Sequence, residues 1–146
     1  MKDTDRNDDG YGGYDLIVIG AGSAGFSASI TAADAGKRVA LVGHGTIGGT
    51  CVNVGCVPSK AMIRAAEAIH GAHSAGRFPG LSGQAQVDDW QTLVQSKDDL
   101  VATLRQKKYA DLLPQYPGVD YIDDGPAQII EGGIIVGGRT LTASKL

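Results

Sequence analysis

The sequence lacks the features that would place the chain in a membrane, outside the cell or on nucleic acid. No run of 18 or more apolar residues occurs, so no membrane-spanning helix is expected. Acidic residues (16) outnumber basic ones (13), and no basic stripe suited to nucleic acid is present. Residues 1–13 are polar and lack the apolar core of a secretion signal. We therefore expect a cytoplasmic protein without membrane or nucleic-acid partners.

Cysteine is scarce as well. The 146 residues include only Cys51 and Cys56, and in the cytoplasm such a pair is more often redox-active or metal-binding than a structural staple. Glycine, in contrast, is abundant at 22 residues, many of them in positions typical of turns or phosphate loops. The length suffices for one domain with a core. Residues 1–13 have too little apolar surface to offset the entropy of ordering, and we predict a flexible tail there.

Residues 14–42 have the pattern of a strand, a glycine turn, a helix and a second strand. The apolar run 14–20 is typical of a strand buried in a parallel sheet, and the motif G-x-G-x-x-G occupies residues 20–25. A proline-free helix is predicted over 22–35, Gly36 is placed to end it, and a strand is predicted over 38–42. This context favours dinucleotide binding over a mere glycine-rich turn in another α/β protein.

Each glycine of the motif has a physical role. Gly20 allows the tight turn, Gly22 lets the backbone approach a pyrophosphate, and Gly25 lets helix and strand pack closely. The helix N-terminus adds unpaired N–H groups and the positive end of the helix dipole. Phosphate groups are therefore expected at this turn.

The end of the second predicted strand departs from the fingerprint. An Asp or Glu usually closes this strand and binds the ribose hydroxyls of the adenosine half. Here Gly43 holds the position, His44 follows, and no carboxylate occurs between Asp34 and Glu67. Ribose recognition would then fall to backbone and water, or to His44. We favour the simpler interpretation of His44 as an exposed loop residue.

Two further helices are predicted, over 58–72 and 88–113, with loops over 45–50 and 71–83. Pro58 suits the first turn of one helix, Asp88 or Asp89 suits the N-cap of the other, and prolines at 114 and 117 end it. Trp90 and Tyr109 are interpreted as packing on a helix face. Strands are predicted over 119–122, 125–130, 133–136 and 139–142, with Gly137 and Gly138 forming a hairpin turn between the last two.

Cys51 and Cys56 stand five residues apart. On a regular helix that step rises about 7.5 Å, whereas a disulfide needs Cα atoms roughly 4.4–6.8 Å apart. A bridge therefore requires bent backbone, which Gly55 permits, and so small a ring would be easily reduced. Cys56 lies at a predicted helix N-terminus, which stabilises a thiolate, and Lys60 follows four residues later on the same face.

Two other interpretations of the cysteines stay open. They are a C-x4-C half-site for a metal, or two unrelated buried thiols. A closed zinc site needs four ligands. The spacing of the other candidate ligands gives it no support, and these are His44, His70 and His73.

Two stretches together resemble the pyridine nucleotide–disulfide oxidoreductases, the flavoprotein disulfide reductases. They are YDLIVIGAGSAG (residues 14–25) and the long, specific GGTCVNVGCVPSK (residues 48–60). Residues 45–70 are most similar to the mercuric reductase branch, although the lipoamide dehydrogenase and glutathione reductase branches share the cysteine pair. The resemblance implies an α/β, Rossmann-like FAD/NAD(P)-binding fold with a parallel sheet, helices and a β-hairpin region, incomplete at the C-terminus.

The resemblance also implies which residues bind FAD. The turn that holds the pyrophosphate would consist of Gly20, Gly22, Ser23, Ala24 and Gly25. Two more residues, Gly49 and Thr50, would lie along the pyrophosphate and ribityl region. The backbone that borders the adenine would include Gly125 and Ala127.

The catalytic residues implied by the resemblance are Cys51, Cys56 and Lys60. Cys56 would be the thiol beside the isoalloxazine and form the charge-transfer thiolate, Cys51 would meet the substrate, and Lys60 would lie near flavin N5. NADPH would reduce FAD, and FAD would reduce the Cys51–Cys56 disulfide. In the mercuric branch the thiolates bind Hg(II), a soft ion suited to sulfur, which is reduced to Hg(0). Alternatives are a small thiol or lipoyl substrate, or a flavin-free module that sequesters soft metal ions.

The resemblance thus predicts that residues 14–146 are the N-terminal part of an FAD-binding domain. The NADPH-binding and dimerisation domains of the family would lie outside the chain, and the full-length form would be a homodimer. The isolated chain is then expected to show no turnover and to expose apolar surface.

Overall fold

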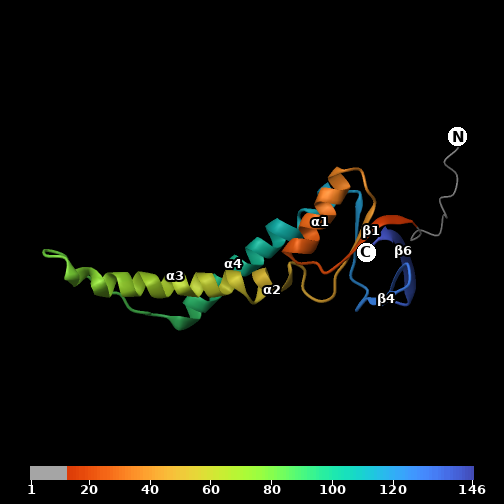
Figure 1. Ribbon diagram of the computed structural model, residues 1–146. Helices are drawn as coiled ribbons and strands as arrows, with labels where there is room; N and C mark the ends of the chain where they lie inside the picture. Colours follow the sequence, from red (N-terminus) through yellow and green to blue (C-terminus); the bar gives the residue numbers. More distant parts are fainter. Residues whose placement is uncertain (1–12) are drawn as a thin grey trace. The chain divides into compact units, whose positions relative to one another are not determined.

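The computed structural model describes residues 13–146, so the predicted tail falls almost entirely outside the described residues (Figure 1). The chain divides into two compact units. The first combines residues up to Gly49 with Lys107–Leu146, and the second is Thr50–Gln106. None of the described helices is long and apolar enough to cross a membrane.

The first unit contains a six-stranded mixed sheet, in the order β3-β2-β1-β6-β5-β4. Neighbours from β3 to β6 are parallel, whereas β6, β5 and β4 pair antiparallel. The strands are β1 (Tyr14–Ile19), β2 (Val39–Val42), β3 (Val119–Ile122), β4 (Gln128–Ile130), β5 (Gly133–Val136) and β6 (Arg139–Lys145). Between β5 and β6, Gly137 and Gly138 form the predicted two-residue turn, both with positive φ.

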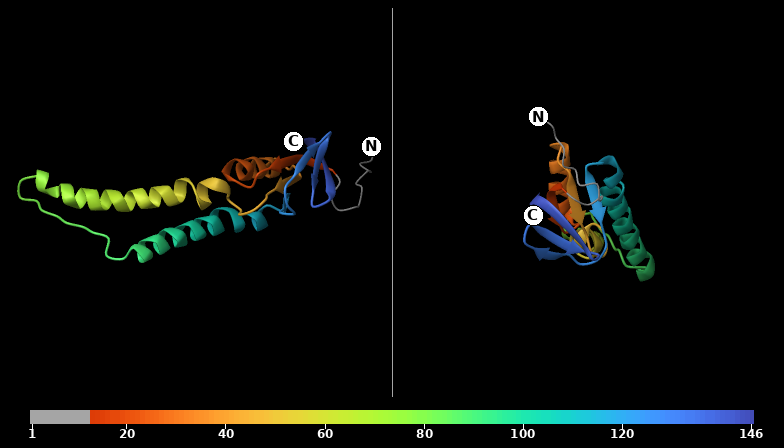
Figure 2. Two further views of the ribbon diagram at one scale, coloured as in Figure 1. Left: turned by 90° about the horizontal axis from the view of Figure 1, so that it is seen from below. Right: turned by 90° about the vertical axis from the view of Figure 1, so that its right-hand side faces the viewer.

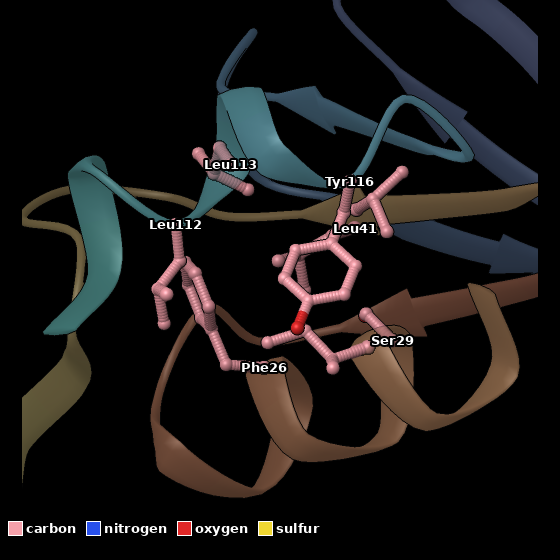
Figure 3. A pocket seen from close by; sticks show the side chains of 8 residues that line it. Phe26, Ser29, Leu41, Leu112, Leu113 and Tyr116 are labelled. Carbon is pink, nitrogen blue, oxygen red and sulfur yellow. The ribbon is translucent and has the colours of Figure 1, made fainter. Parts of the chain in front are cut away.

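Different elements pack on the two faces of the sheet. On one face, β5 and β6 contribute Ile134, Val136 and Leu141 to a buried cluster with residues of β1, β2 and β3. On the other face lies α1 (Ser23–Asp34), which ends before Gly36 as predicted. Helix α1 and the 3₁₀ turn η3 (Leu113–Gln115) enclose an apolar hollow with no room for a water molecule (Figure 3). The sheet therefore has the buried centre expected of a parallel α/β layer.

The second unit contains α2 (Gly49–Asn53), which begins one residue before the unit, then α3 (Cys56–His73), the 3₁₀ turn η1 (Ser74–Arg77) and α4 (Trp90–Arg105). Helices α3 and α4 lie side by side and run in opposite directions (Figure 2). Asp89 caps α4 by accepting hydrogen bonds from the backbone N–H groups of Gln91 and Thr92 at 2.9 and 3.1 Å. The capping prediction for this helix is therefore confirmed.

Several sequence predictions need correction. The predicted helix over 88–113 is shorter in the structure, since α4 ends at Arg105. A π-helical turn, η2 (Gln106–Ala110), follows it, and Tyr109 of this turn is buried in the first unit. Trp90 does not pack, since 60% of it is exposed. The loop predicted over 45–50 gives way to α2 at Gly49, and strand β4 begins at Gln128 rather than at 125.

Candidate dinucleotide and thiol sites

The glycine turn after β1 is closed by direct backbone contact. Gly20 has a φ of +115°, and a Cβ atom placed on Gly25 would lie 1.8 Å from the carbonyl oxygen of Gly20. The first hydrogen bond of α1 runs from Phe26 N–H to the carbonyl of Gly22 at 2.9 Å. The N–H groups of Ser23, Ala24 and Gly25 precede it and have no acceptor within the helix, so they are available to an anion.

A second glycine segment lies against this turn. Gly48 N–H donates to the carbonyl of Ala21 at 2.8 Å, and a Cβ atom on Gly49 would lie 2.8 Å from Gly22 Cα. Two backbones approach this closely only where both residues lack side chains. The structure thus brings Gly49 to the glycine turn.

Tyr109 contacts the same helix start, which the sequence did not reveal. Its hydroxyl forms a hydrogen bond with the Ser23 hydroxyl at 2.8 Å, and its ring meets Phe26 edge-on with centroids 4.9 Å apart. The packing predicted for Tyr109 is confirmed, at 8% exposure. Its polar partner lies 86 residues away, and no local pattern indicates such a pair.

At the end of β2, the position of the missing carboxylate is crowded. A Cβ atom on Gly43 would lie 2.6 Å from the hydroxyl oxygen of Tyr121 and 3.0 Å from Ala21 Cβ. His44 is exposed, in agreement with the simpler interpretation. Tyr121 on β3 is the residue that the sequence reasoning missed here.

The segment predicted to border the adenine connects β3 to β4. Gly125 has a φ of +105°, and Ala127 packs against the buried cluster of the sheet. Next to them, Asp124 forms an ion pair with Arg139 at the start of β6. The adenine contact of Gly125 and Ala127 stays a prediction.

The two cysteines lie on successive short turns of backbone. Cys51 belongs to α2, and Cys56 is the first residue of α3, two residues earlier than predicted. Between the helices, a Cβ atom on Gly55 would lie 3.0 Å from the carbonyl oxygen of Thr50 and 3.3 Å from Cys51 Cα. The bend expected between the cysteines is therefore present, and Gly55 makes it possible by lacking a side chain.

Both cysteines are free and exposed thiols. The hydrogen bond between the Cys51 and Cys56 side chains raises the pKa of Cys51, with desolvation adding to the rise and the positive charge of Lys60 opposing it. Among the described residues, no group of three or more His, Cys, Asp or Glu side chains could hold a metal ion, which gives the half-site interpretation no support.

Comparison with known proteins shows which family has these features. The family model described as "Pyridine nucleotide-disulphide oxidoreductase" matches residues 14–143. The chain belongs to this family. It is 50% identical over 119 residues to the mercuric reductase of Streptomyces lividans, covering 78% of this chain and 25% of that protein.

One further relative and one solved structure support the same family. The mercuric reductase of Staphylococcus aureus is 46% identical over 134 residues, covering 92% of this chain and 24% of that protein. The copper(II) complex of the HOCl-induced flavoprotein disulfide reductase RclA from Escherichia coli matches with a TM-score of 0.69 and 29% identity. That match covers 88% of this chain and 26% of RclA, so the chain spans about a quarter of the length of these relatives.

The predicted site residues of the chain fall in two groups. The structure gathers the glycines of the turn, Gly20, Gly22 and Gly25, with Gly49. Separately, it pairs Cys51 with Cys56 and places Lys60 one turn along α3. The chain itself joins the groups, since Thr50 follows Gly49 directly.

Proposed function

We propose that this chain is the FAD-binding and redox-thiol part of an NADPH-dependent oxidoreductase that reduces Hg(II) to Hg(0). The observation that carries the proposal is the hydrogen-bonded pair of thiols, Cys51 on α2 and Cys56 at the start of α3, in a chain that is 50% identical over 119 residues to a mercuric reductase. Two adjacent thiols with a bend between them suit both disulfide formation and the binding of a soft ion.

The residues of the first unit fit a pyrophosphate. Three N–H groups without helical acceptors lie at the start of α1, and Gly22 and Gly49 approach each other closely beside them. The residues proposed to hold FAD are Gly20, Gly22, Ser23, Ala24, Gly25, Gly49, Thr50, Gly125 and Ala127. When bound, FAD supplies the two electrons that open the Cys51–Cys56 disulfide.

The thiols then act in sequence. Opening the disulfide takes two electrons and one proton and gives one thiol and one thiolate. Cys56, which accepts the hydrogen bond from Cys51, is proposed to be the thiolate that faces the cofactor, and Cys51 is proposed to meet the substrate. Both sulfurs bind Hg(II) once Cys51 has lost its proton, and two further electrons, which would originate from NADPH, release Hg(0). Lys60 stabilises the negative charge that appears on these sulfurs.

A titration of the reduced chain with Hg(II) tests the proposal. One Hg(II) per chain is expected to remove both thiols from reaction with DTNB, and FAD is expected to stay with the chain through gel filtration. The variants Cys51→Ala and Cys56→Ala should each lose tight Hg(II) binding, while His70→Ala on the far end of α3 should keep it. Hg(II) binding that survives in the double cysteine variant would contradict the proposal.

The same experiment distinguishes two alternative functions. Hg(II) capture without any flavin binding favours a soft-metal module. Flavin binding without Hg(II) capture favours a reductase of a small thiol or lipoyl disulfide, as in the glutathione reductase and lipoamide dehydrogenase branches. We further propose a cytoplasmic location and, for the full-length enzyme, a homodimer.

A further inference from the structure

The structure shows what occupies the position of the missing ribose carboxylate. At the end of β2, the space in which a side chain on Gly43 would begin is filled by the phenol of Tyr121, whose hydroxyl lies 2.6 Å from that point. The same point lies 3.0 Å from Ala21 Cβ in the glycine turn. The Tyr121 hydroxyl therefore stands beside the fingerprint, where a carboxylate from β2 would otherwise stand.

The sheet holds this arrangement by its register. Leu41 on β2 pairs with Tyr121 on β3, and Gly43 N–H donates to the carbonyl of Ile122 at 2.9 Å. Alternation along β3 points Ile122 toward the buried cluster and Tyr121 toward the face that carries α1. The phenol is thus fixed by two strands at their carboxyl ends, the edge at which α/β sheets bind ligands.

The hydroxyl is free to bind a ligand. Among residues 13–146, the structure records no hydrogen bond for Tyr121, and its side chain is only partly buried. Desolvation, assisted by the charge of Asp123, raises the pKa of Tyr121, so the phenol keeps its proton at neutral pH. A protonated phenol both donates and accepts a hydrogen bond, as contact with a ribose diol requires.

We propose that Tyr121 binds the adenosine ribose of the dinucleotide in place of the carboxylate that β2 lacks, and that Gly43 is glycine because this phenol occupies its side-chain space. The inference rests on the proposed dinucleotide function. In this arrangement, a neutral hydroxyl from the neighbouring strand β3 takes the place of the negatively charged acceptor on β2.

Binding of ADP, followed by isothermal titration calorimetry, tests the ribose contact. Tyr121→Phe should weaken ADP binding about 3- to 10-fold, the effect of one neutral hydrogen bond, and should leave the binding of 2′,3′-dideoxy-ADP unchanged. Tyr116→Phe makes the same chemical change beside the apolar hollow under α1 and should alter neither. Equal losses for both nucleotides, or no loss for either, would overturn the inference. If the unaltered chain bound neither ADP nor FAD, the proposed function would fail with it.

A reciprocal exchange tests the steric half of the inference. Gly43→Glu alone should weaken FAD binding, since its side chain meets the Tyr121 ring. Tyr121→Ala should weaken it too, by removing the hydroxyl. The double variant opens space for a carboxylate at position 43, and we expect it to bind FAD more tightly than either single variant. Additive losses in the double variant would show that the two positions do not share this site.

Discussion

At Gly25, helix α1 comes so close to the end of β1 that no side chain fits. A Cβ atom there would lie 1.8 Å from the carbonyl oxygen of Gly20, and backbone cannot yield as a flexible side chain does. Gly25→Ala should therefore push α1 away from the turn and disperse the N–H groups that face the phosphates. We expect at least a 10-fold loss of FAD affinity, measured by quenching of flavin fluorescence.

A second glycine provides the matched control for this substitution. Gly71 lies within α3, where an added Cβ atom meets nothing within 4 Å. Gly71→Ala should keep FAD affinity and stabilise the chain by about 0.5–1 kcal/mol, since alanine is the better helix former. If both variants lost FAD equally, the close contact at Gly25 would not be the cause.

The pH dependence of Cys51 follows from its neighbour. The hydrogen bond to Cys56 raises the pKa of Cys51, so less Cys51 thiolate is present at a given pH below that pKa. Cys56→Ala removes the main cause, and the pKa of Cys51 should fall toward its ordinary value. Alkylation of Cys51 by iodoacetamide at pH 8, followed by peptide mass spectrometry, should become severalfold faster.

Lys60 should act on Cys51 in the opposite direction. Its positive charge lowers the pKa of Cys51, so Lys60→Met should raise that pKa and slow alkylation at pH 8. Lys97→Met, on α4, is the control for loss of a lysine. A Cys51 profile that is identical in all these variants would contradict the proposed coupling of the two thiols.

At the scale of elements, the start of α4 depends on one carboxylate. Asp89 accepts from Thr92 Oγ1 at 2.6 Å and from two backbone N–H groups, and these bonds lower its pKa, with the Thr92 side chain as the largest cause. Asp89→Ala should lower Tm by a few degrees at pH 7. Because the folded pKa is lowered, the stabilisation is present above the ordinary pKa of 3.8 and is lost as pH falls below it.

The neighbouring aspartate makes a sharp control. In the part of the chain that the structure describes, Asp88 accepts a hydrogen bond only from the Gln86 side chain and caps no helix, so Asp88→Ala should leave Tm almost unchanged. The difference in Tm between the two variants should shrink between pH 7 and pH 3. A difference independent of pH would show that the Asp89 carboxylate does not stabilise the helix through its charge.

Helix α1 carries a polar group that the fold leaves unsatisfied. Ser29 is 1% exposed and lines the apolar hollow of Figure 3, and its hydroxyl has no hydrogen-bond partner within the described residues 13–146. Ser29→Ala should stabilise the chain by about 1–3 kcal/mol, because an unpaired buried hydroxyl is removed and nothing is lost. Ser27→Ala, exposed on the same helix, changes only helix propensity and should give a smaller gain in urea denaturation.

The elements that the sequence predicted well are those defined by local pattern. Apolar runs predicted strands β1 and β2. Glycines at positions that require a positive φ or close packing predicted the ends of helix α1 and the Gly137-Gly138 turn. The bend at Gly55 followed from the spacing of the cysteines. Tyr109 and Tyr121 were missed as polar groups at the glycine turn, since their partners Ser23 and Gly43 lie far away in sequence and meet them only after folding. Helix α2 was not predicted, because a segment of five residues that includes a glycine has little helical pattern.

At the scale of the whole molecule, the first unit is assembled from two separate segments of the chain. The N-terminal segment supplies β1 and β2, and the C-terminal segment adds a strand on each side of them, β3 beside β2 and β6 beside β1. The intervening second unit contains residues 78–89, which form no helix or strand. The sheet, rather than the continuity of the chain, should therefore hold the two segments together.

Limited proteolysis tests this assembly. Phe78 and Leu81 are 52% and 59% exposed, so chymotrypsin should cut first within residues 78–81. The two fragments should separate on a denaturing gel yet elute together at the size of the intact chain in native gel filtration, because β3 and β6 stay paired to the N-terminal strands. The double variant F78A/L81A should resist this first cut. Fragments that part in native buffer would show that the strand pairing does not hold the unit without the connecting chain.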